Sequence, residues 1–379
     1  MYLSNDERDE LRSTARSLLA RESSSERVRA TIVEPAGFDR ALWDTMTELG
    51  WTTIHVPADR GGAGSGYGDL AVVLHELGRS ITPSPFLASA VLATGALLLA
   101  DLGGVAGELL ASLTSSASLG SVAFASTNGS YDVGHLTTTW RSDAGALRLN
   151  GAAGFVLDAD VTDVLLVAAR DEQGTVAAVA VDTTGPGMRV ERAATVDETR
   201  RLFTVSFDDV SVAAERMLCE PGAPAAALFD RVLALGVIAA ACDAAGVAEQ
   251  ALERASEYAK ERVQFGKPIG SFQAVKHHCA DMAIAVEASR AATRAAANAL
   301  DGDRSDWSTT AAITSSYVGP ACAHACALAL LVHGGVGFTW EHDSHLFVKR
   351  VKLDECLFGT PAWHRRRLAD SVFPALVAS

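Results

Sequence analysis

The first third of the chain places its apolar residues with the period of an α-helix. These residues recur three, four or seven positions apart, as at Leu11, Leu18, Leu42, Met46 and Leu49. A helix with this pattern has one apolar face, which must be buried against a neighbouring element. We therefore predict an N-terminal α-helical domain over residues 1–117.

The pattern changes between residues 118 and 219, where short apolar segments follow one another. Stretches such as ALRLNGAAGFVLD, GTVAAVAVDTT and LFTVSFDDVSV are separated by Gly, Asp and Asn. β-Branched and aromatic residues favour strands, and Gly, Asp and Asn favour the turns between them. No helix-length pattern interrupts the segments, which disfavours a parallel sheet with crossover helices. We predict a middle β domain over 118–219, folded as an antiparallel barrel or sandwich.

Residues 220–379 return to a helical pattern and are rich in alanine. The segments 225–260, 271–300 and 309–332 are each long enough for one helix. Long helices with an apolar face pack side by side, and alanine permits their close approach. We predict a C-terminal domain that resembles a four-helix bundle. The fold class is then mostly α with a central β domain (α+β).

The net charge of the chain disfavours two classes of binding partner. The chain has 379 residues, and its 46 Asp and Glu outnumber its 32 Lys and Arg, which gives a net charge of −14. A negative protein is repelled by nucleic acids and by anionic membrane surfaces, so we expect neither as a partner. The first residues lack the apolar core of a signal peptide, and the apolar runs are shorter than the roughly 18–20 residues of a membrane span. We expect a cytoplasmic protein.

The six cysteines lack the paired spacing of a disulfide framework, so we expect free thiols. Cys322 and Cys326 are one helical turn apart, with His324 between them, and can face a metal. No second pair of ligands is nearby. We therefore interpret both cysteines as core residues of an alanine-rich helix and expect no metal.

The segment YAKERVQFGKPIGSFQAVKHHCADM contains residues suited to binding a large organic anion. Arg262 follows a helical stretch, and its guanidinium offers a rigid set of donors that matches a pyrophosphate. Phe265 can stack on a ring system, and Gln273, eleven residues after Arg262, can reach the same ligand. The alternative is that Arg262 binds the last carbonyl groups of its own helix and that Phe265 is a core residue.

A second segment, HGGVGFTWEHDSHLFVKR, is rich in glycine. Gly334, Gly335 and Gly337 let backbone amides approach a ligand closely, and successive free amides form a concavity that binds anions. The alternative is a helix C-cap followed by a turn.

These two segments resemble the signature motifs of acyl-CoA dehydrogenases. A third, LGWTTIHVPADRGGAGSGYGDLAVVLHELGR, is similar to the N-terminal helices of that family, and the three occur in the family's order over nearly the whole chain. The resemblance implies an FAD cofactor, an acyl-CoA substrate, an oligomer, and electron-transfer flavoprotein as the electron acceptor. It also implies contacts with FAD held mainly by a neighbouring subunit from Arg262, Phe265, Gln273, Gly334 and Gly335, and a cofactor contact from Thr360.

The resemblance further implies a reaction that needs a carboxylate. In the family a buried carboxylate removes the α-proton of the acyl thioester while a hydride leaves the β-carbon for the flavin. In most members this base directly precedes a Gly-Thr pair, and here Phe358 precedes Gly359 and Thr360. Other members carry the base ten residues before a glycine that matches Gly246, a position held here by Gly236. Neither Phe358 nor Gly236 can accept a proton.

Nearby acidic residues are weaker candidates for the base. Asp243 lies one helical turn before the matched glycine, although an acid that caps or bridges helices is the better explanation. Asp354 and Glu355 lie in the charged run KRVKLDE, where solvated side chains are expected. His364 begins a basic cluster that can meet the phosphates of CoA, although a solvated helix or a subunit contact explains it better.

Three further departures from the family concern the chain's own flavin. The segment FASTNGSYD retains Gly129 and Ser130 but lacks the Thr-Glu-Pro that precedes them in the family. Phe155 and Leu157 stand in a segment that replaces a Trp-x-Thr, and Leu331 replaces a glutamine. Together these changes predict a flavin site that is incomplete when built from this chain alone.

Three functions agree with these observations. We favour a subunit of a heteromeric acyl-CoA dehydrogenase that lacks its own base, resembling the paired assemblies of bacterial sterol side-chain oxidation. The first alternative is a self-sufficient homo-oligomeric enzyme with a displaced base at Asp243, Asp354 or Glu355. The second is a non-enzymatic protein that binds acyl-CoA or another protein. We choose the subunit because the retained residues are those that face a neighbour's FAD.

Overall fold

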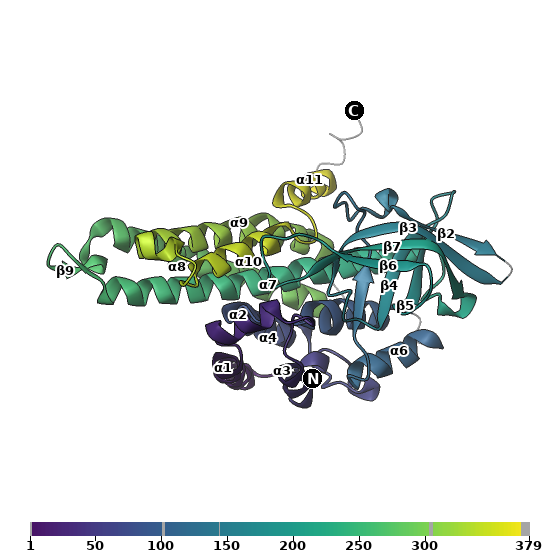
Figure 1. Ribbon diagram of the computed structural model, residues 1–379, viewed down its shortest axis with the longest axis horizontal. Helices are drawn as coiled ribbons and strands as arrows, with labels where there is room; N and C mark the ends of the chain where they lie inside the picture. Colours follow the sequence, from purple (N-terminus) through teal and green to yellow (C-terminus); the bar gives the residue numbers. More distant parts are fainter. Residues whose placement is uncertain (1, 101–102, 144, 303–305, 373–379) are drawn as a thin grey trace. The chain divides into compact units, whose positions relative to one another are not determined.

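The computed structural model describes residues 2–100, 103–143, 145–302 and 306–372. These residues form two compact units. The first joins Val33–Ser65 to Pro83–Gly236, and the second joins Tyr2–Ile32, Gly66–Thr82 and the chain from Val237 onward. The predicted order of helical, β and helical segments is confirmed (Figure 1). The domain boundaries at residues 117 and 219 stay a prediction.

The first unit is built on a sheet of seven strands, which are β1 Gly120–Ala123, β2 Thr138–Asp143, β3 Ala146–Leu157, β4 Val164–Arg170, β5 Val176–Asp182, β6 Met188–Arg192 and β7 Leu202–Ala213. Their order is β1-β4-β2-β3-β7-β6, with β5 paired to β4. Most ladders are antiparallel, as predicted. The exceptions are β1, which runs parallel to β4, and a single parallel bridge between β2 and β4.

Irregular pairing bends the longest strands of this sheet. The register of β3 against β7 shifts between Leu149 and Gly151 and again between Ala153 and Val156. Extra residues of this kind bend a strand and increase its twist, so the sheet curls around its apolar core. The core contains valine, leucine, alanine and phenylalanine side chains from β3, β4, β5 and β7.

The other elements of the first unit are α3 Arg40–Glu48, η1 Trp51–Thr53, η2 Ala58–Arg60, η3 Phe86–Ala93, α5 Thr94–Leu99, α6 Val105–Thr114, η4 Val133–His135 and η5 Ala214–Arg216. Asp39 caps α3 by accepting hydrogen bonds from the amides of Ala41 and Leu42. Such a cap satisfies amides that have no partner within the helix. Trp43 of α3 contacts Phe86 of η3 edge-on, with 6.5 Å between ring centroids.

The second unit contains α1 Asn5–Glu22, α2 Ser25–Val33, α4 Tyr67–Arg79, α8 Gln273–Asp301, η6 Ile269–Ser271, α9 Trp307–His333, η7 Gly334–Phe338, α10 Ser344–Cys356, α11 Pro361–Val372 and the later part of α7 Ala223–Glu261. The three long helices predicted at 225–260, 271–300 and 309–332 are confirmed within two residues at each end. Helices α7 to α10 lie side by side (Figure 1) and share one apolar core.

Small residues allow the helices of this unit to pack closely. A Cβ atom on Gly246 of α7 would lie 1.9 Å from the carbonyl oxygen of His75 on α4, and one on Gly78 would lie 2.1 Å from that of Asp243. Only glycine permits such an approach of two backbones. Cys322 and Cys326 are buried in the shared core while His324 between them is exposed, which supports their interpretation as core residues.

Two helices are long and apolar enough to span a membrane by length and composition alone, α7 and the segment Trp307–Phe338. The most apolar part of each is 78% and 50% buried, respectively, within the chain. Core helices of soluble proteins give the same result, so we do not assign a membrane span to either helix.

Candidate functional site

The segment after α7 forms a short hairpin at one end of the bundle (Figure 1). Its strands are β8 Val263–Gln264 and β9 Lys267–Pro268, and Phe265 at the turn has a φ angle of 51°. The side chain of Phe265 is 92% exposed and makes an edge contact with the ring of Phe272. The interpretation of Phe265 as a core residue is therefore wrong. Its ring is free to contact a ligand or a neighbouring chain.

Arg262 stands at the base of the same hairpin. Its amide donates to the carbonyl of Tyr258, and its carbonyl accepts from the amide of Ile269, so its backbone is fixed. Its exposed side chain makes no hydrogen bond or ion pair with the residues that the structure describes. The alternative that Arg262 binds the end of its own helix is therefore not what the structure shows. Gln273 is also exposed, at the first position of α8.

The glycine segment lies at the same end of the bundle. His333, the last residue of α9, stacks on Tyr258 with 4.8 Å between ring centroids, and Tyr258 lies one turn before Arg262. Gly334 has a φ angle of 64°, and a Cβ atom on Gly334 or Gly335 would meet nothing within 4 Å. The amide of Gly334 donates to the carbonyls of Leu330 and Leu331 and so caps α9, which is the predicted alternative. An anion-binding concavity formed by the amides of this segment stays a prediction. The structure thus brings together the two predicted cofactor segments.

The cavity beside these segments is acidic. It has a volume of about 380 Å³, and three glutamates of α7, Glu253, Glu257 and Glu261, outnumber the one arginine that lines it, Arg254. Carboxylates repel a phosphate, so the cavity itself is a poor site for one. Burial lowers the pKa of His333, which keeps this ring neutral and does not offset the acidic charge. A phosphate at this end would instead meet the guanidinium of Arg262.

Apolar side chains are exposed around the glycine segment. Leu331, Val336, Phe338 and Trp340 are each between 43% and 67% exposed. Exposed apolar groups that lie together in this way are typical of surfaces that another molecule covers. These side chains flank the glycine segment in the sequence, which favours a neighbouring chain at this place.

Phe358 occupies a buried turn between α10 and α11. It is 2% exposed and has a φ angle of 64°, followed by Gly359 at 104°. A Cβ atom on Gly359 would lie 2.6 Å from the ring of Trp363, so only glycine fits there. Thr360, a predicted cofactor contact, accepts a hydrogen bond from the amide of Trp363 and so caps α11. Its contact with a cofactor stays a prediction.

His364 holds this turn from α11. It is buried, and its Nε2 atom lies 2.9 Å from the carbonyl oxygen of Phe358. Burial lowers its pKa to about 4, so the ring is neutral at pH 7 and donates to that carbonyl. The interpretation of His364 as part of a solvated basic cluster is therefore wrong, because packing of α11 removes it from water.

Asp243 is engaged in a buried ion pair. Both of its oxygens accept hydrogen bonds from Arg350 of α10, at 2.8 and 2.9 Å. This geometry fits the interpretation of an acid that bridges two helices. A bidentate pair with arginine stabilises the charged carboxylate, which makes it a weaker base.

The two acids before Phe358 differ in environment. Asp354 is buried, and its carboxylate lies 3.8 Å from Nε of Arg350, so its expected solvation is wrong. It faces the core because it lies one turn after Arg350 on the same helix. Glu355 is half-buried against Gly319 of α9 and forms an ion pair with Lys352. Gly236 lies inside α7 and has no side chain to offer.

In the first unit, the segment with Gly129 and Ser130 forms a tight turn. Its ends are joined by Ser126, whose hydroxyl accepts from the amide of Ser130 at 3.0 Å. Phe155 packs over this turn, since a Cβ atom on Gly129 would lie 3.4 Å from its ring. Phe155 is partly exposed at a φ angle of 55°, whereas Leu157 is buried. No polar side chain stands at either of the two positions.

Three of the candidate segments share one backbone feature. Phe155, Phe265 and Phe358 all have positive φ angles, a conformation that costs energy for a residue other than glycine. Such strain persists where the surrounding structure demands it, and it gathers at functional sites. Sequence reasoning missed this feature, as well as the roles of Tyr258 and Arg350. The only available signal was the position of Tyr258, one helical turn before Arg262.

Comparison with known proteins identifies two matching family models. The model described as "Acyl-CoA dehydrogenase, N-terminal domain" matches residues 5–106, and that described as "Acyl-CoA dehydrogenase, C-terminal domain" matches residues 227–373. Acyl-CoA dehydrogenase IpdE2 of Mycobacterium tuberculosis is 32% identical over 370 residues, which cover 97% of this chain and 98% of the relative.

Two solved structures have a similar fold and similar sequences. One is a variant of the Tcur3481-Tcur3483 steroid ACAD, with a TM-score of 0.87, 28% identity and coverage of 99% of both chains. The other is the ChsE4-ChsE5 complex from Mycobacterium tuberculosis, with a TM-score of 0.86, 27% identity and coverage of 98% of both chains. Each of these names joins two different proteins.

Proposed function

The chain belongs to the acyl-CoA dehydrogenase family, and from this premise we propose that it is one subunit of a two-chain enzyme whose partner supplies the catalytic base. As a member of the family it is an FAD-dependent oxidoreductase that acts on acyl-CoA. This chain would contribute contacts to the cofactor, and a second chain would contribute the catalytic base.

The observation that carries the proposal is the environment of the usual base positions. Phe358 is a buried phenylalanine and Gly236 is a glycine, so neither can take a proton. Asp243 is already engaged by Arg350, which argues against it as a displaced base. Asp354 lies beside the same guanidinium and Glu355 pairs with Lys352, which argues against these two as well. We therefore infer that the carboxylate that removes the α-proton comes from another chain.

The hairpin and the glycine segment support the other part of the proposal, which is that this chain contacts a cofactor held by its partner. Arg262, Phe265 and Gln273 are exposed, and the side chain of Arg262 has no partner among the described residues. These residues suit a cofactor held by a neighbour. Arg262 would bind its pyrophosphate, Phe265 would contact a ring, and the open space around Gly334 and Gly335 would let the cofactor approach the backbone. When bound, FAD supplies the acceptor for the substrate hydride.

The relatives suggest the type of assembly and of substrate. The two similar structures carry paired names, and one of them is named a steroid ACAD. We infer that the partner is a second member of the family with an intact glutamate before Gly-Thr, and that the acyl group belongs to a steroid side chain or a similar bulky acid. Electron-transfer flavoprotein is the inferred acceptor, and the cytoplasm the inferred location.

Co-expression tests the proposal. The chain is purified alone and together with such a partner, and flavin absorbance and acyl-CoA-dependent dye reduction are measured for both. We expect stoichiometric flavin and activity in the mixed complex only. A chain that is yellow and active by itself would contradict the proposal and would favour the self-sufficient enzyme with a displaced base.

A single substitution tests the part assigned to the hairpin. Arg262→Gln in the mixed complex should lower the flavin content, because it removes the guanidinium that meets the pyrophosphate, while the free energy of unfolding of the chain alone stays unchanged. Arg189→Gln, at another exposed arginine on β6, is the matched control and should leave the flavin content unchanged. Equal flavin content in both variants would contradict the role of Arg262.

A further inference from the structure

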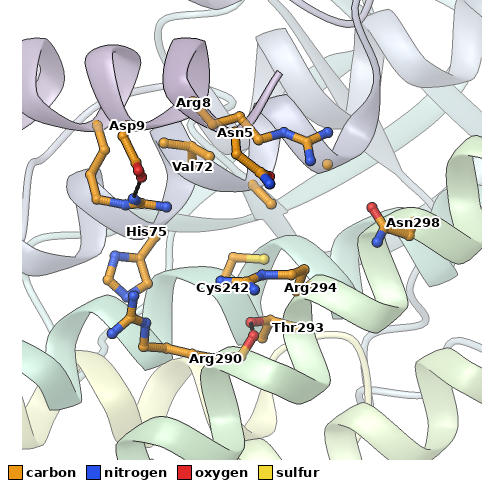
Figure 2. A pocket seen from close by; sticks show the side chains of 13 residues that line it. Asn5, Arg8, Asp9, Val72, His75, Cys242, Arg290, Thr293, Arg294 and Asn298 are labelled. Carbon is orange, nitrogen blue, oxygen red and sulfur yellow. Dashed lines mark hydrogen bonds and ion pairs between the residues drawn. The ribbon is translucent and has the colours of Figure 1, made fainter. Parts of the chain in front are cut away.

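A cleft of about 450 Å³ opens in the second unit, with residues of α1, α4, α7 and α8 around it (Figure 2). It lies far from the predicted cofactor contacts. Arg290, one of its residues, stands 17 positions after Gln273 on α8, which corresponds to about 25 Å along the helix axis. None of the residues assigned to flavin or to the base borders it.

Most of the charged side chains that line the cleft are arginines, although the whole chain carries a net charge of −14. Arg8 and Arg12 of α1 line the cleft, as do Arg290 and Arg294 of α8. Figure 2 shows Arg8 across the cleft from Arg290 and Arg294. Asp9 is the one carboxylate among the described residues that line it, and it pairs with Arg12. The lining thus contains four guanidinium groups and one carboxylate, and three carboxylates outside the lining, those of Asp69, Glu249 and Glu287, contact Arg8 and Arg290.

Two of these arginines, Arg8 and Arg290, are held in position by ion pairs with neighbouring carboxylates. Nε of Arg8 donates to Asp69 at 2.6 Å, and Asp69 itself accepts hydrogen bonds from the amides of Leu3 and Gly66. This contact uses one donor of Arg8 and orients the rest of the guanidinium. Arg290 donates to Glu287 at 3.0 Å, and its Nε lies 3.8 Å from Glu249. Arginines oriented in this way lose little freedom when they bind an anion.

Arg294 is the arginine without such support. Its exposed side chain makes no hydrogen bond or ion pair with any residue of the described ranges. All of its donors are available to a ligand, and they lie on the same side of the cleft as those of Arg290. An unpaired arginine beside three oriented or paired ones is the arrangement expected of an anion site.

The floor of the cleft does not oppose an anion. It contains Val72 of α4 and the buried thiol of Cys242 of α7. Burial, with the nearby charge of Asp243, raises the pKa of Cys242 to about 12, so this thiol is neutral. Burial alone would lower the pKa of His75, but the neighbouring carboxylates of Glu249 and Glu76, at 3.1 and 3.5 Å, raise it.

We propose that this cleft binds a small polyanion, whose phosphate or carboxylate groups are held by Arg8 and Arg12 of α1 and by Arg290 and Arg294 of α8. The volume falls within the roughly 300–1,000 Å³ of small-molecule sites. Arginines of two helices around an apolar floor suit a ligand with at least two negative groups separated by a less polar part. The site does not depend on the proposed division between two chains.

Calorimetric titration of the full-length chain tests this inference. Pyrophosphate, ADP and citrate are the probes at low ionic strength, and adenosine is the uncharged control. We expect at least one of the three anions to bind and adenosine not to bind. Binding of pyrophosphate and ADP without citrate would identify phosphate as the recognised group, and the reverse would identify carboxylate. Failure of all three anions to bind would overturn the inference.

Variants locate the bound anion. Arg12 and Arg294 take no part in the buried ion pairs, so the double variant Arg12→Gln/Arg294→Gln should fold normally and bind at least about tenfold more weakly. Arg21→Gln, on the same helix α1 but outside the cleft, is the matched control. Arg262→Gln should also bind as wild type does. Wild-type affinity in the double variant, or lost affinity in Arg262→Gln, would overturn the assignment to this cleft.

Discussion

The buried pair between Asp243 and Arg350 offers the sharpest test of how the second unit is held together. The variant Arg350→Met removes the guanidinium and keeps most of the volume of the side chain. It leaves the carboxylate of Asp243 buried without the two hydrogen bonds, of 2.8 and 2.9 Å, that now satisfy it. The carboxylate of Asp354, at 3.8 Å from the same guanidinium, loses its nearest positive charge as well.

The expected cost follows from this geometry. Removing one partner of a buried ion pair destabilises a protein by roughly 3–5 kcal/mol, because a charge is left in a medium of low dielectric constant. Asp243 and Arg350 are each 3% exposed, so water cannot replace the lost partner. At about 1.4 kcal/mol for each factor of ten, the ratio of folded to unfolded chain should fall by two to four orders of magnitude.

Urea unfolding followed by circular dichroism measures this cost. The double variant Asp243→Asn/Arg350→Met removes the charge of Asp243 together with its partner, although Asp354 keeps its charge. Its loss of stability should therefore be smaller than the sum of the two single losses, with a coupling of about 1–3 kcal/mol. Arg40→Met is the matched control. It breaks an exposed pair with Asp44 on α3, and its cost should stay below about 1 kcal/mol.

Two results would refute this reasoning. The first is an Arg350→Met variant that loses no more stability than Arg40→Met. The second concerns the role of Asp243 as a base. If Asp243→Asn kept normal stability but abolished the activity of the assembled enzyme, the carboxylate would act in the reaction and not as a bridge between helices.

Two further predictions concern packing and pH. Gly246→Ala should lower the free energy of unfolding by about 1–3 kcal/mol, because its Cβ atom would lie 1.9 Å from the carbonyl oxygen of His75. Gly335→Ala is the control, because the space around Gly335 is open. Equal urea midpoints for the two variants would contradict the close contact of α4 and α7. His364 remains neutral in the folded chain down to its pKa of about 4, whereas an unfolded chain takes up this proton near pH 6.5. Stability should therefore fall as the pH drops from 6.5 to 4, and His364→Gln should lessen this fall by roughly 3 kcal/mol. Parallel curves of unfolding free energy against pH for the two proteins would contradict the buried, neutral ring.

Much of the fold could be predicted from the sequence because the relevant signals are local. The period of the apolar residues located three long helices within two residues, and short Val-rich segments located the sheet. The sequence also shows directly that Phe358 and Gly236, at the two positions expected for the base, have no acidic group whatever their surroundings. Family motifs added the cofactor segments around Arg262 and Gly334.

Tertiary structure decided which distant side chains meet. Arg350 pairs with Asp243 across 107 positions of sequence, and the same packing buries Asp354 and His364, which a charged run had suggested were solvated. The cationic cleft likewise joins arginines from α1 and α8 that have no common motif. The period of the apolar residues predicts which face of a helix is buried, but it does not predict which element packs against that face. The sequence by itself therefore determined the elements and the side chains at the two expected base positions, whereas the contacts between helices decided the charge, burial and accessibility of each remaining group.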